Sequence, residues 1–333
     1  MKISDDKKQR LRELHELRPA YNWVLVLYLG LWAAAAAWTL HAPSLGWKLP
    51  GYALSGIMIQ ALAIVMHECV HAKFFDPSTK LGRWANRWVG VPLVFPILFS
   101  ATAYRVSHLH HHRYERSIED MDEFENFTRR PALLKLLLVG WLLIGAWYYP
   151  VHTAIHGLRL ADAHERRAII FEYALLAATL VLVFVLVPIR VVADVWLIPL
   201  IVTVLVTQVR GVAEHVFTPG DEPIRATRTV RSNLAVSLLM GNLNYHLGHH
   251  LFPGVPWYNQ RKLYDLLLDD YQAAGASIYG SYLGFLWDFA RVLTVRVPHP
   301  VAAPPSQARY YPHYMPILPG AVGGARALSR NSD

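Results

Sequence analysis

The feature that most constrains this fold is a pair of long apolar runs close to the N-terminus. Residues 21–40 and 49–66 contain no Asp, Glu, Lys or Arg, and a helix needs about 20 apolar residues to cross a bilayer core. The composition agrees, because only 17% of residues are charged, whereas soluble domains have about 25%. These values exclude a disordered chain, a collagen, a coiled coil and most soluble enzymes. We predict an all-α integral membrane protein.

Further apolar runs follow, and they differ in their ability to span a membrane. They lie at 89–103, 132–151, 168–189 and 195–209. The first of them is short for a span and contains Pro92 and Pro96, so we expect it to lie in the membrane interface or to re-enter. The last two are separated by only a short turn, and we predict that they cross the membrane as a pair. With the two N-terminal runs, this gives about four transmembrane helices.

Histidines gather beside these runs at spacings typical of metal ligands. The chain has 17 histidines and a single cysteine, Cys69, which excludes disulfide frameworks and Cys-based metal clusters. On a helix, residues at i, i+3 and i+4 share a face. That spacing occurs in one HExxH and two HxxHH patterns, and a further histidine follows the sixth apolar run. The candidate ligands are His67, His71, His108, His111, His112, His215, His246, His249 and His250.

Not every histidine or neighbouring side chain fits this pattern. His110 lies at i+2 from His108 and therefore points off the shared face. Cys69 lies at i+2 from His67, so we assign it to packing. Taken alone, the HECVH sequence at 67–71 also matches a zinc protease helix with Glu68 as general base. That alternative needs a third ligand and leaves the other spaced histidines without a role.

Basic residues predict the orientation. Lys and Arg are frequent before residue 21, between 73 and 130, and after the sixth apolar run, but they are rare in the loops 41–48 and 190–194. The positive-inside rule therefore places both termini and all the spaced histidines in the cytoplasm. His215 returns to that side only after an even number of crossings. We therefore expect residues 132–151 to be interfacial or half-inserted.

The histidine patterns resemble those of a known family. HECVH, HLHHH and HLGHH, together with RGVAEHV and NYHLGHHLFPGVPWY, are similar to the boxes of the membrane fatty acid desaturase superfamily, in its bacterial single-domain branch. The resemblance covers residues 14–293. It implies four membrane helices and a cytoplasmic helical cap around a di-iron centre, with the nine candidate histidines as ligands. In animal relatives an asparagine precedes the extra histidine by four residues, but here that position is Gly211.

Nine neutral imidazoles would leave the charge of two ferrous ions uncompensated. We therefore expect carboxylates that hold the imidazole N–H groups and offset that charge. Side chains near the boxes in sequence are candidates for this role or, because of Gly211, for completing the iron coordination. These candidates are Glu68, Asp120, Asp122, Glu214, Asn242 and Asn244.

The resemblance implies an oxidoreductase that uses O2 to introduce a double bond into a fatty-acyl or acyl-like substrate. Electrons would come from a separate donor such as ferredoxin, because the chain has no Rossmann fingerprint, cysteine cluster or HPGG segment. The net charge of +8 would attract an acidic carrier and anionic lipid. Nucleic acid is not an expected partner, because the basic residues flank the membrane runs. The expected location is a bacterial inner membrane.

Other functions stay open from the sequence. Within the superfamily they are a hydroxylase or ketolase, or a desaturase of a specialised metabolite of the rhizobitoxine or carotenoid type. Outside it they are the zinc metalloprotease and a non-catalytic metal-handling protein. We divide the chain into a lead at 1–20, a membrane desaturase-like domain at 21–297 and an extended or disordered tail at 298–333.

Overall fold

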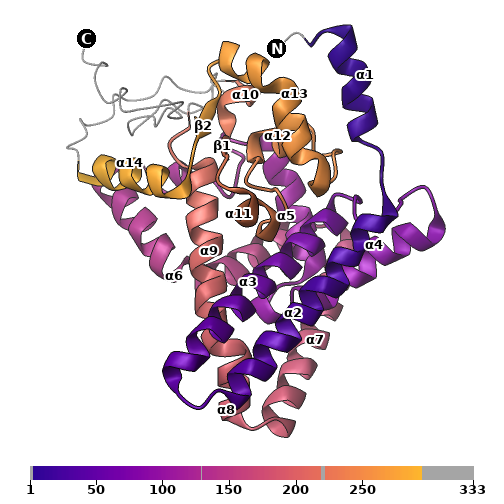
Figure 1. Ribbon diagram of the computed structural model, residues 1–333, viewed down its shortest axis with the longest axis vertical. Helices are drawn as coiled ribbons and strands as arrows, with labels where there is room; N and C mark the ends of the chain where they lie inside the picture. The colour runs from indigo at the N-terminus through magenta and orange to yellow at the C-terminus, as the bar shows by residue number, and fades with distance from the viewer. Residues whose placement is uncertain (1–2, 129, 219–221, 295–333) are drawn as a thin grey trace.

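A computed structural model describes residues 3–128, 130–218 and 222–294, so the predicted tail lies outside the described residues. Figure 1 shows long helices below a cap of shorter elements. The N-terminal and membrane-region elements are α1 (Asp5–Leu14), η1 (Pro19–Asn22), α2 (Trp23–His41), α3 (Leu45–Val70), α4 (Lys80–Leu93), η2 (Phe95–Ile97), α5 (Ala101–Tyr114), η3 (Phe124–Asn126), α6 (Pro131–Leu160), α7 (Ala163–Leu186), α8 (Ile189–Val192), the π-turn η4 (Ala193–Leu197) and α9 (Ile198–His215). The cap elements are α10 (Pro223–Ala226), β1 (Arg228–Val230), α11 (Leu234–Leu239), α12 (His246–Leu251), η5 (Trp257–Asn259), α13 (Gln260–Ala273), β2 (Ser277–Tyr279) and α14 (Tyr282–Thr294).

Four helical segments of the described chain are long and apolar enough to cross a membrane. They are Pro19–His41, Leu45–Val70, Ala163–Leu186 and Ile189–His215. This confirms the prediction of four membrane helices and a predominantly helical fold. The helices are not equivalent, because α3 is largely buried among its neighbours whereas α2 and α7 expose most of their side chains. The helix that carries His67 therefore lies at the centre of the bundle.

The two remaining apolar runs are not straight spans. The run at 89–103 contains the end of α4, the turn η2 and the start of α5, and Leu98 there has a left-handed backbone with φ +64°. Helix α6 bends by 100° between Pro131–Gly145 and Trp147–Leu160, so it forms either one broken span or a re-entrant pair. The expectation that residues 132–151 depart from a simple crossing is consistent with this bend.

Close helix contacts fix the centre of the bundle. A Cβ atom on Gly56 of α3 would lie 2.4 Å from the carbonyl oxygen of Pro199 on α9, so only glycine allows this approach. The Thr203 hydroxyl donates to the Gly56 carbonyl at 2.8 Å. Small residues and interhelical hydrogen bonds of this kind are what hold helices together in lipid. At the far end of the same helix pair, Lys48 Nζ lies 2.6 Å from Asp194 Oδ2.

The cap is anchored to the bundle and includes the N-terminal helix. Strands β1 and β2 pair in parallel, with Arg228 opposite Ser277. Helix α1 packs on α13, where Lys7 forms an ion pair with Asp270. Leu11 of α1 packs against the apolar cluster that includes Leu263 and Leu267 of α13. The segment predicted as a lead therefore contributes a helix to the cap.

Candidate metal centre

Nine histidines from four separate helices meet where the bundle joins the cap. They come from the end of α3, from α5, from the end of α9 and from α12. Their ring nitrogens form three sets, of which two share His215 and are taken together as one group. The five-histidine group contains His67, His71, His108, His112 and His249, and the carboxylate-backed group contains His111, His215, His246 and His250 together with Glu115 and Glu214. Every histidine predicted as a ligand is present in one of these groups.

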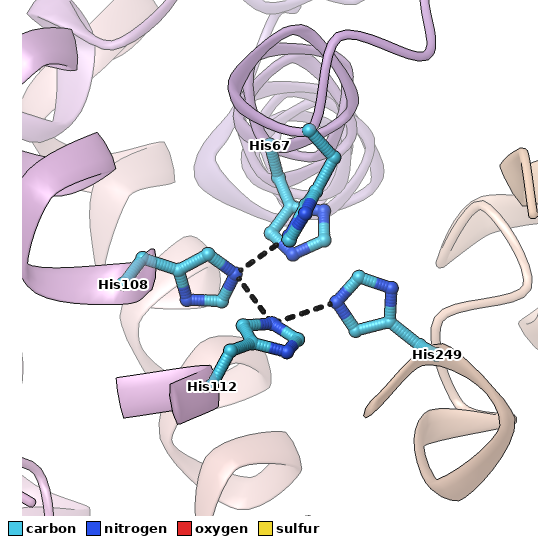
Figure 2. A group of neighbouring side chains, drawn as sticks. His67, His108, His112 and His249 are labelled. Atoms are coloured by element: carbon cyan, nitrogen blue, oxygen red, sulfur yellow. Dashed lines mark hydrogen bonds between the residues drawn. The ribbon is translucent and has the colours of Figure 1, made fainter. Parts of the chain in front are cut away.

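The five-histidine group is compact. Its ligand atoms all lie within 4.8 Å of one another, and Figure 2 shows the rings of His67, His108, His112 and His249 pointing toward one another. The Nε2 atom of His108 lies 3.0 Å from Nε2 of His71 and 3.0 Å from Nε2 of His112. Both ring nitrogens of His67 are buried without a hydrogen-bond partner in the described structure.

The carboxylate-backed group has the same packing of rings but adds acids. His246 Nε2 lies 2.8 Å from His215 Nε2 and 3.0 Å from His250 Nε2. The His111 ring centroid is 4.8 Å from that of His215. On the outer side, His250 Nδ1 lies 3.0 Å from Glu115 Oε2, and His246 Nδ1 lies 3.2 Å from Glu214 Oε2.

Both HxxHH boxes divide their histidines between the two groups in the same way. Residues at i and i+4 differ by about 40° around a helix, whereas the residue at i+3 is about 100° from the one at i+4. His108 and His112 therefore join the five-histidine group, while His111 joins the other. In α12, His246 and His250 join the carboxylate-backed group and His249 crosses to the five-histidine group. Each box thus connects two ion sites.

These residues fit metal ions. An ion about 2.1 Å from each nitrogen would set neighbouring nitrogens about 3 Å apart, close to the Nε2 separations given above. Burial, reinforced by neighbouring groups, lowers the pKa of the imidazoles on α5 and α12 well below its usual value for His108, His112, His246, His249 and His250. Neutral imidazole is the form that binds metal. These five imidazoles are therefore in their metal-binding state at neutral pH.

Comparison with known proteins shows which family has this arrangement of histidines. The Fatty acid desaturase family matches residues 47–282. The chain belongs to this family. It is 25% identical over 319 residues to an sn-1 oleoyl-lipid 12-desaturase of Picosynechococcus sp., covering 85% of each chain. It is also 26% identical over 301 residues to the human sphingolipid delta(4)-desaturase/C4-monooxygenase DES2, covering 85% of this chain and 84% of that protein.

Family membership makes this chain a membrane desaturase and an oxidoreductase, and its histidine clusters indicate a metal site. It replaces the zinc protease interpretation of HECVH. In the desaturase, Glu68 is held by contacts within the protein. Its Oε2 accepts a hydrogen bond from the backbone N–H of Trp257 at 3.0 Å, and its Oε1 lies 3.6 Å from His67 Nδ1. Glu68 therefore ties the α3 end to the loop that follows α12.

The carboxylates predicted near the boxes have different roles in the desaturase. Asp120 accepts hydrogen bonds from His111 Nδ1 at 2.9 and 3.0 Å. Burial disfavours the charged form of His111, but Asp120 outweighs it and raises the His111 pKa to about 10. The Nδ1 proton is thus held on the outer side of the ring, and Nε2 faces inward. Asp120 and Glu214 thus both contact box histidines.

Asp122, Asn242 and Asn244 have other partners. Asp122 Oδ1 lies 3.6 Å from Nδ1 of His152, which is not a box histidine. The Asn244 amide donates to the carbonyl oxygens of Val230 and Arg231 and so fixes β1 against the chain before α12. Asn242 has a left-handed backbone, φ +53°, in a tight turn. Within the described residues, no hydrogen bond joins these three side chains to a box histidine. Their contacts and backbone conformation belong to the loops around the site.

Two side chains that support the site were not identified from the sequence. Glu115 contacts His250 and lies 3.7 Å from His215 Nδ1, and its only sequence signal is its position three residues after the second box. Arg228, which belongs to a run of arginines spaced by three, is fully buried rather than exposed. Its guanidinium donates to the carbonyl oxygens of Ala213, Val216 and Phe217. It therefore satisfies the open end of α9 that carries His215.

A membrane glutamate positions the second box. Helix α5 begins after Ser100, and Glu172 on α7 accepts hydrogen bonds from the Ser100 hydroxyl at 2.6 Å and from the Thr102 backbone N–H at 2.9 Å. A carboxylate at a helix N-terminus satisfies free N–H groups and interacts favourably with the helix dipole. Glu172 thus sets the start of the helix on which His108, His111 and His112 lie.

A cavity of about 220 Å³ extends from the histidines into the bundle. Its lining combines box histidines with apolar residues such as Ile64, Phe99 and Leu200. Gly211 also lines it, and a Cβ atom there would meet nothing within 4 Å. The position occupied by asparagine in animal relatives is therefore open space here.

Proposed function

We propose that this protein removes two hydrogens from neighbouring carbons of a fatty-acyl or acyl-like substrate to form a double bond. The two hydrogens, two electrons and two protons reduce one O2 to two molecules of water. The observation that carries the proposal is the pair of histidine groups joined by the two divided HxxHH boxes. It supports two ions held close together by His67, His71, His108, His112 and His249 and by His111, His215, His246 and His250.

Iron is the proposed metal, because imidazole suits it and the family oxidises unactivated carbon. When bound, it supplies the oxygen chemistry that such carbons require. The chain's own residues hold and orient it. Asp120, Glu115 and Glu214 lie behind the imidazoles of one group, where they fix ring orientation and offset positive charge. The apolar part of the cavity would bind a carbon chain and exclude water.

The electrons are proposed to come from a separate donor such as ferredoxin. The positive-inside pattern supports a cytoplasmic location for the cap, both termini and the histidines, in a bacterial inner membrane. An acidic electron carrier in the cytoplasm would then meet the side of the protein that is richer in Lys and Arg. The human relative's printed name includes C4-monooxygenase activity, so hydroxylation of the same substrate is the second candidate function.

The proposal is tested by expression in a bacterial host with a compatible ferredoxin system, followed by lipid and metabolite profiling. New double bonds support it, and new hydroxyl groups alone select the second candidate. Purified protein should contain about two irons per chain. One zinc and no iron would contradict the proposal. His110→Ala is the matched control for ligand variants, because His110 lies on the same helix as the second box but outside both groups.

A further inference from the structure

An arginine borders the cavity inside the membrane bundle. Arg210 lies on α9, and its side chain is only 15% exposed. It lines the same cavity as His67, His108 and His215. A charged side chain within a membrane helix is costly, and it usually marks a substrate or ion pathway. Its partners therefore indicate what the cavity is built to hold.

Only one N–H group of Arg210 is engaged by its ion-pair partner, Glu214. Its Nε donates to Glu214 Oε2 at 2.9 Å, and the same Glu214 faces His246 Nδ1. The two terminal nitrogens make no hydrogen bond within the described residues, and neither is among the side-chain atoms sealed inside the protein. A guanidinium has five N–H donors in a planar fork. Four of them make no hydrogen bond within the described residues, and the Arg210 side chain lines the cavity.

Two glutamines extend this polar wall. Gln60 on α3 and Gln208 on α9 also line the cavity, and each is nearly inaccessible. The Gln60 carbonyl oxygen accepts from the Thr207 hydroxyl, but the Gln60 amide nitrogen and the Gln208 amide make no hydrogen bond within the described chain. The adjacent Gly211 leaves open space. Arg210 and the two amides therefore line the same cavity as the box histidines.

The charges at this place favour an anion. Glu214 balances the charge of Arg210, but Glu214 is shared with His246 of a group that would hold a metal cation. Four other acids line the cavity, and each has a partner of its own. Glu115 and Asp120 face His250 and His111, Glu123 forms an ion pair with Arg116, and Asp122 lies 3.6 Å from His152. A planar fork with free parallel N–H groups matches a carboxylate, which it binds with two hydrogen bonds.

We propose that Arg210 binds a carboxylate of the substrate, with Gln60 and Gln208 as further donors. The inference rests on the proposed function for the reaction and adds the substrate class. The substrate is a carboxylic acid whose charged group enters the cavity beside the histidines, rather than a chain whose head group stays at the membrane surface. The cavity volume of about 220 Å³ is below the range of roughly 300–1,000 Å³ for drug-sized ligands. It therefore suits a short acid.

Binding of octanoate and of methyl octanoate to detergent-purified protein tests this directly. Isothermal titration calorimetry would compare wild type, Arg210→Gln, Arg210→Lys and the control Arg167→Gln, which changes an exposed arginine on α7. We expect octanoate to bind wild type and the control roughly tenfold or more tightly than the ester, as a charged hydrogen-bonded pair implies. In Arg210→Gln the two ligands should bind alike, and Arg210→Lys should be intermediate.

Equal binding of acid and ester to wild type would overturn the proposal. Unchanged preference in Arg210→Gln would do the same. Metal-depleted wild type should still prefer the acid, and loss of the preference there would assign the carboxylate to the metal instead. Arg210→Lys keeps the charge beside Glu214, so it separates loss of recognition from loss of folding. The assay needs no turnover. A preserved acid preference without O2-dependent products would therefore refute the proposed reaction but not this site.

Discussion

The two histidine groups differ in what lies behind their rings. In the carboxylate-backed group, Asp120, Glu115 and Glu214 each lie within 3.2 Å of a histidine Nδ1 atom. In the five-histidine group the nearest carboxylate is Glu68, at 3.6 Å from His67 Nδ1 and engaged by the Trp257 N–H. Two ions held here would therefore be unequal. The first would be supported by negative charge, and the second almost wholly by neutral imidazoles.

The largest expected effect comes from removing an imidazole that defines the five-histidine group. His249→Ala should lower product formation on the order of 100-fold or more, because the ion there has no carboxylate to compensate for a lost ligand. Iron should fall from about two per chain toward one. His110→Ala should keep both iron and product. If His249→Ala retained two irons and full activity, His249 would not be a ligand.

Neutralising the carboxylate behind one histidine of each group should affect the metal affinities of the two groups differently. Asp120→Asn keeps the shape but removes the charge that holds the His111 Nδ1 proton, and changes of this kind cost about 10- to 100-fold in metal affinity. Glu68→Gln should cost less, since Glu68 makes no hydrogen bond to His67. Metal affinity is measured by competition with a chelator. Equal losses in the two variants would remove the proposed difference between the groups.

This asymmetry also shows how far the sequence could lead. Spacing predicted eight of the nine candidate histidines, because i, i+3 and i+4 patterns are local, whereas His215 was predicted from its place after the sixth apolar run and from the family resemblance. It did not predict that His111 and His249 cross to the group opposite their box neighbours, since that depends on how α5 and α12 approach each other. Apolar runs predicted four spans, but they did not predict the 100° bend of α6. Glu115 and Arg210 are single charges without any period. The three-residue spacing of Arg228 with its neighbouring arginines is typical of an exposed basic segment. In the structure Arg228 is instead buried against the carbonyl end of α9.

A variant that loosens α5 should affect the two groups alike. Glu172→Ala leaves the Ser100 hydroxyl and the Thr102 N–H without their buried acceptor, at a cost of about 1–3 kcal/mol for an unsatisfied donor. We therefore expect a lower thermal unfolding temperature. Because α5 contributes histidines to both groups, any loss of iron should affect the two groups equally. Glu172→Gln should be milder. Selective loss of one iron in the alanine variant would indicate that the α5 start supports a single group.

Acid should release metal only well below neutral pH. Burial lowers the pKa of His71 to about 4. A lowered pKa means that the imidazole stays neutral as the pH falls below 6.5, and protons compete for it only near pH 4. Iron retained after gel filtration should therefore be unchanged from pH 7 to about 5.5 and should fall toward pH 4. Release of iron already at pH 6.5 would show that the rings are as accessible as free histidine.

The smallest effect is expected at Gly211, which lies beside the carboxylate-backed group. A methyl group there meets nothing within 4 Å, and alanine is more favourable than glycine within a helix by up to about 1 kcal/mol. Gly211→Ala should therefore fold with an equal or slightly higher unfolding temperature and with unchanged iron content. Gly211→Asn would place a polar group in the same open space. If the group is complete with His111, His215, His246, His250 and its acids, this variant gains no metal affinity. A marked gain would show that the group lacks a ligand that asparagine supplies.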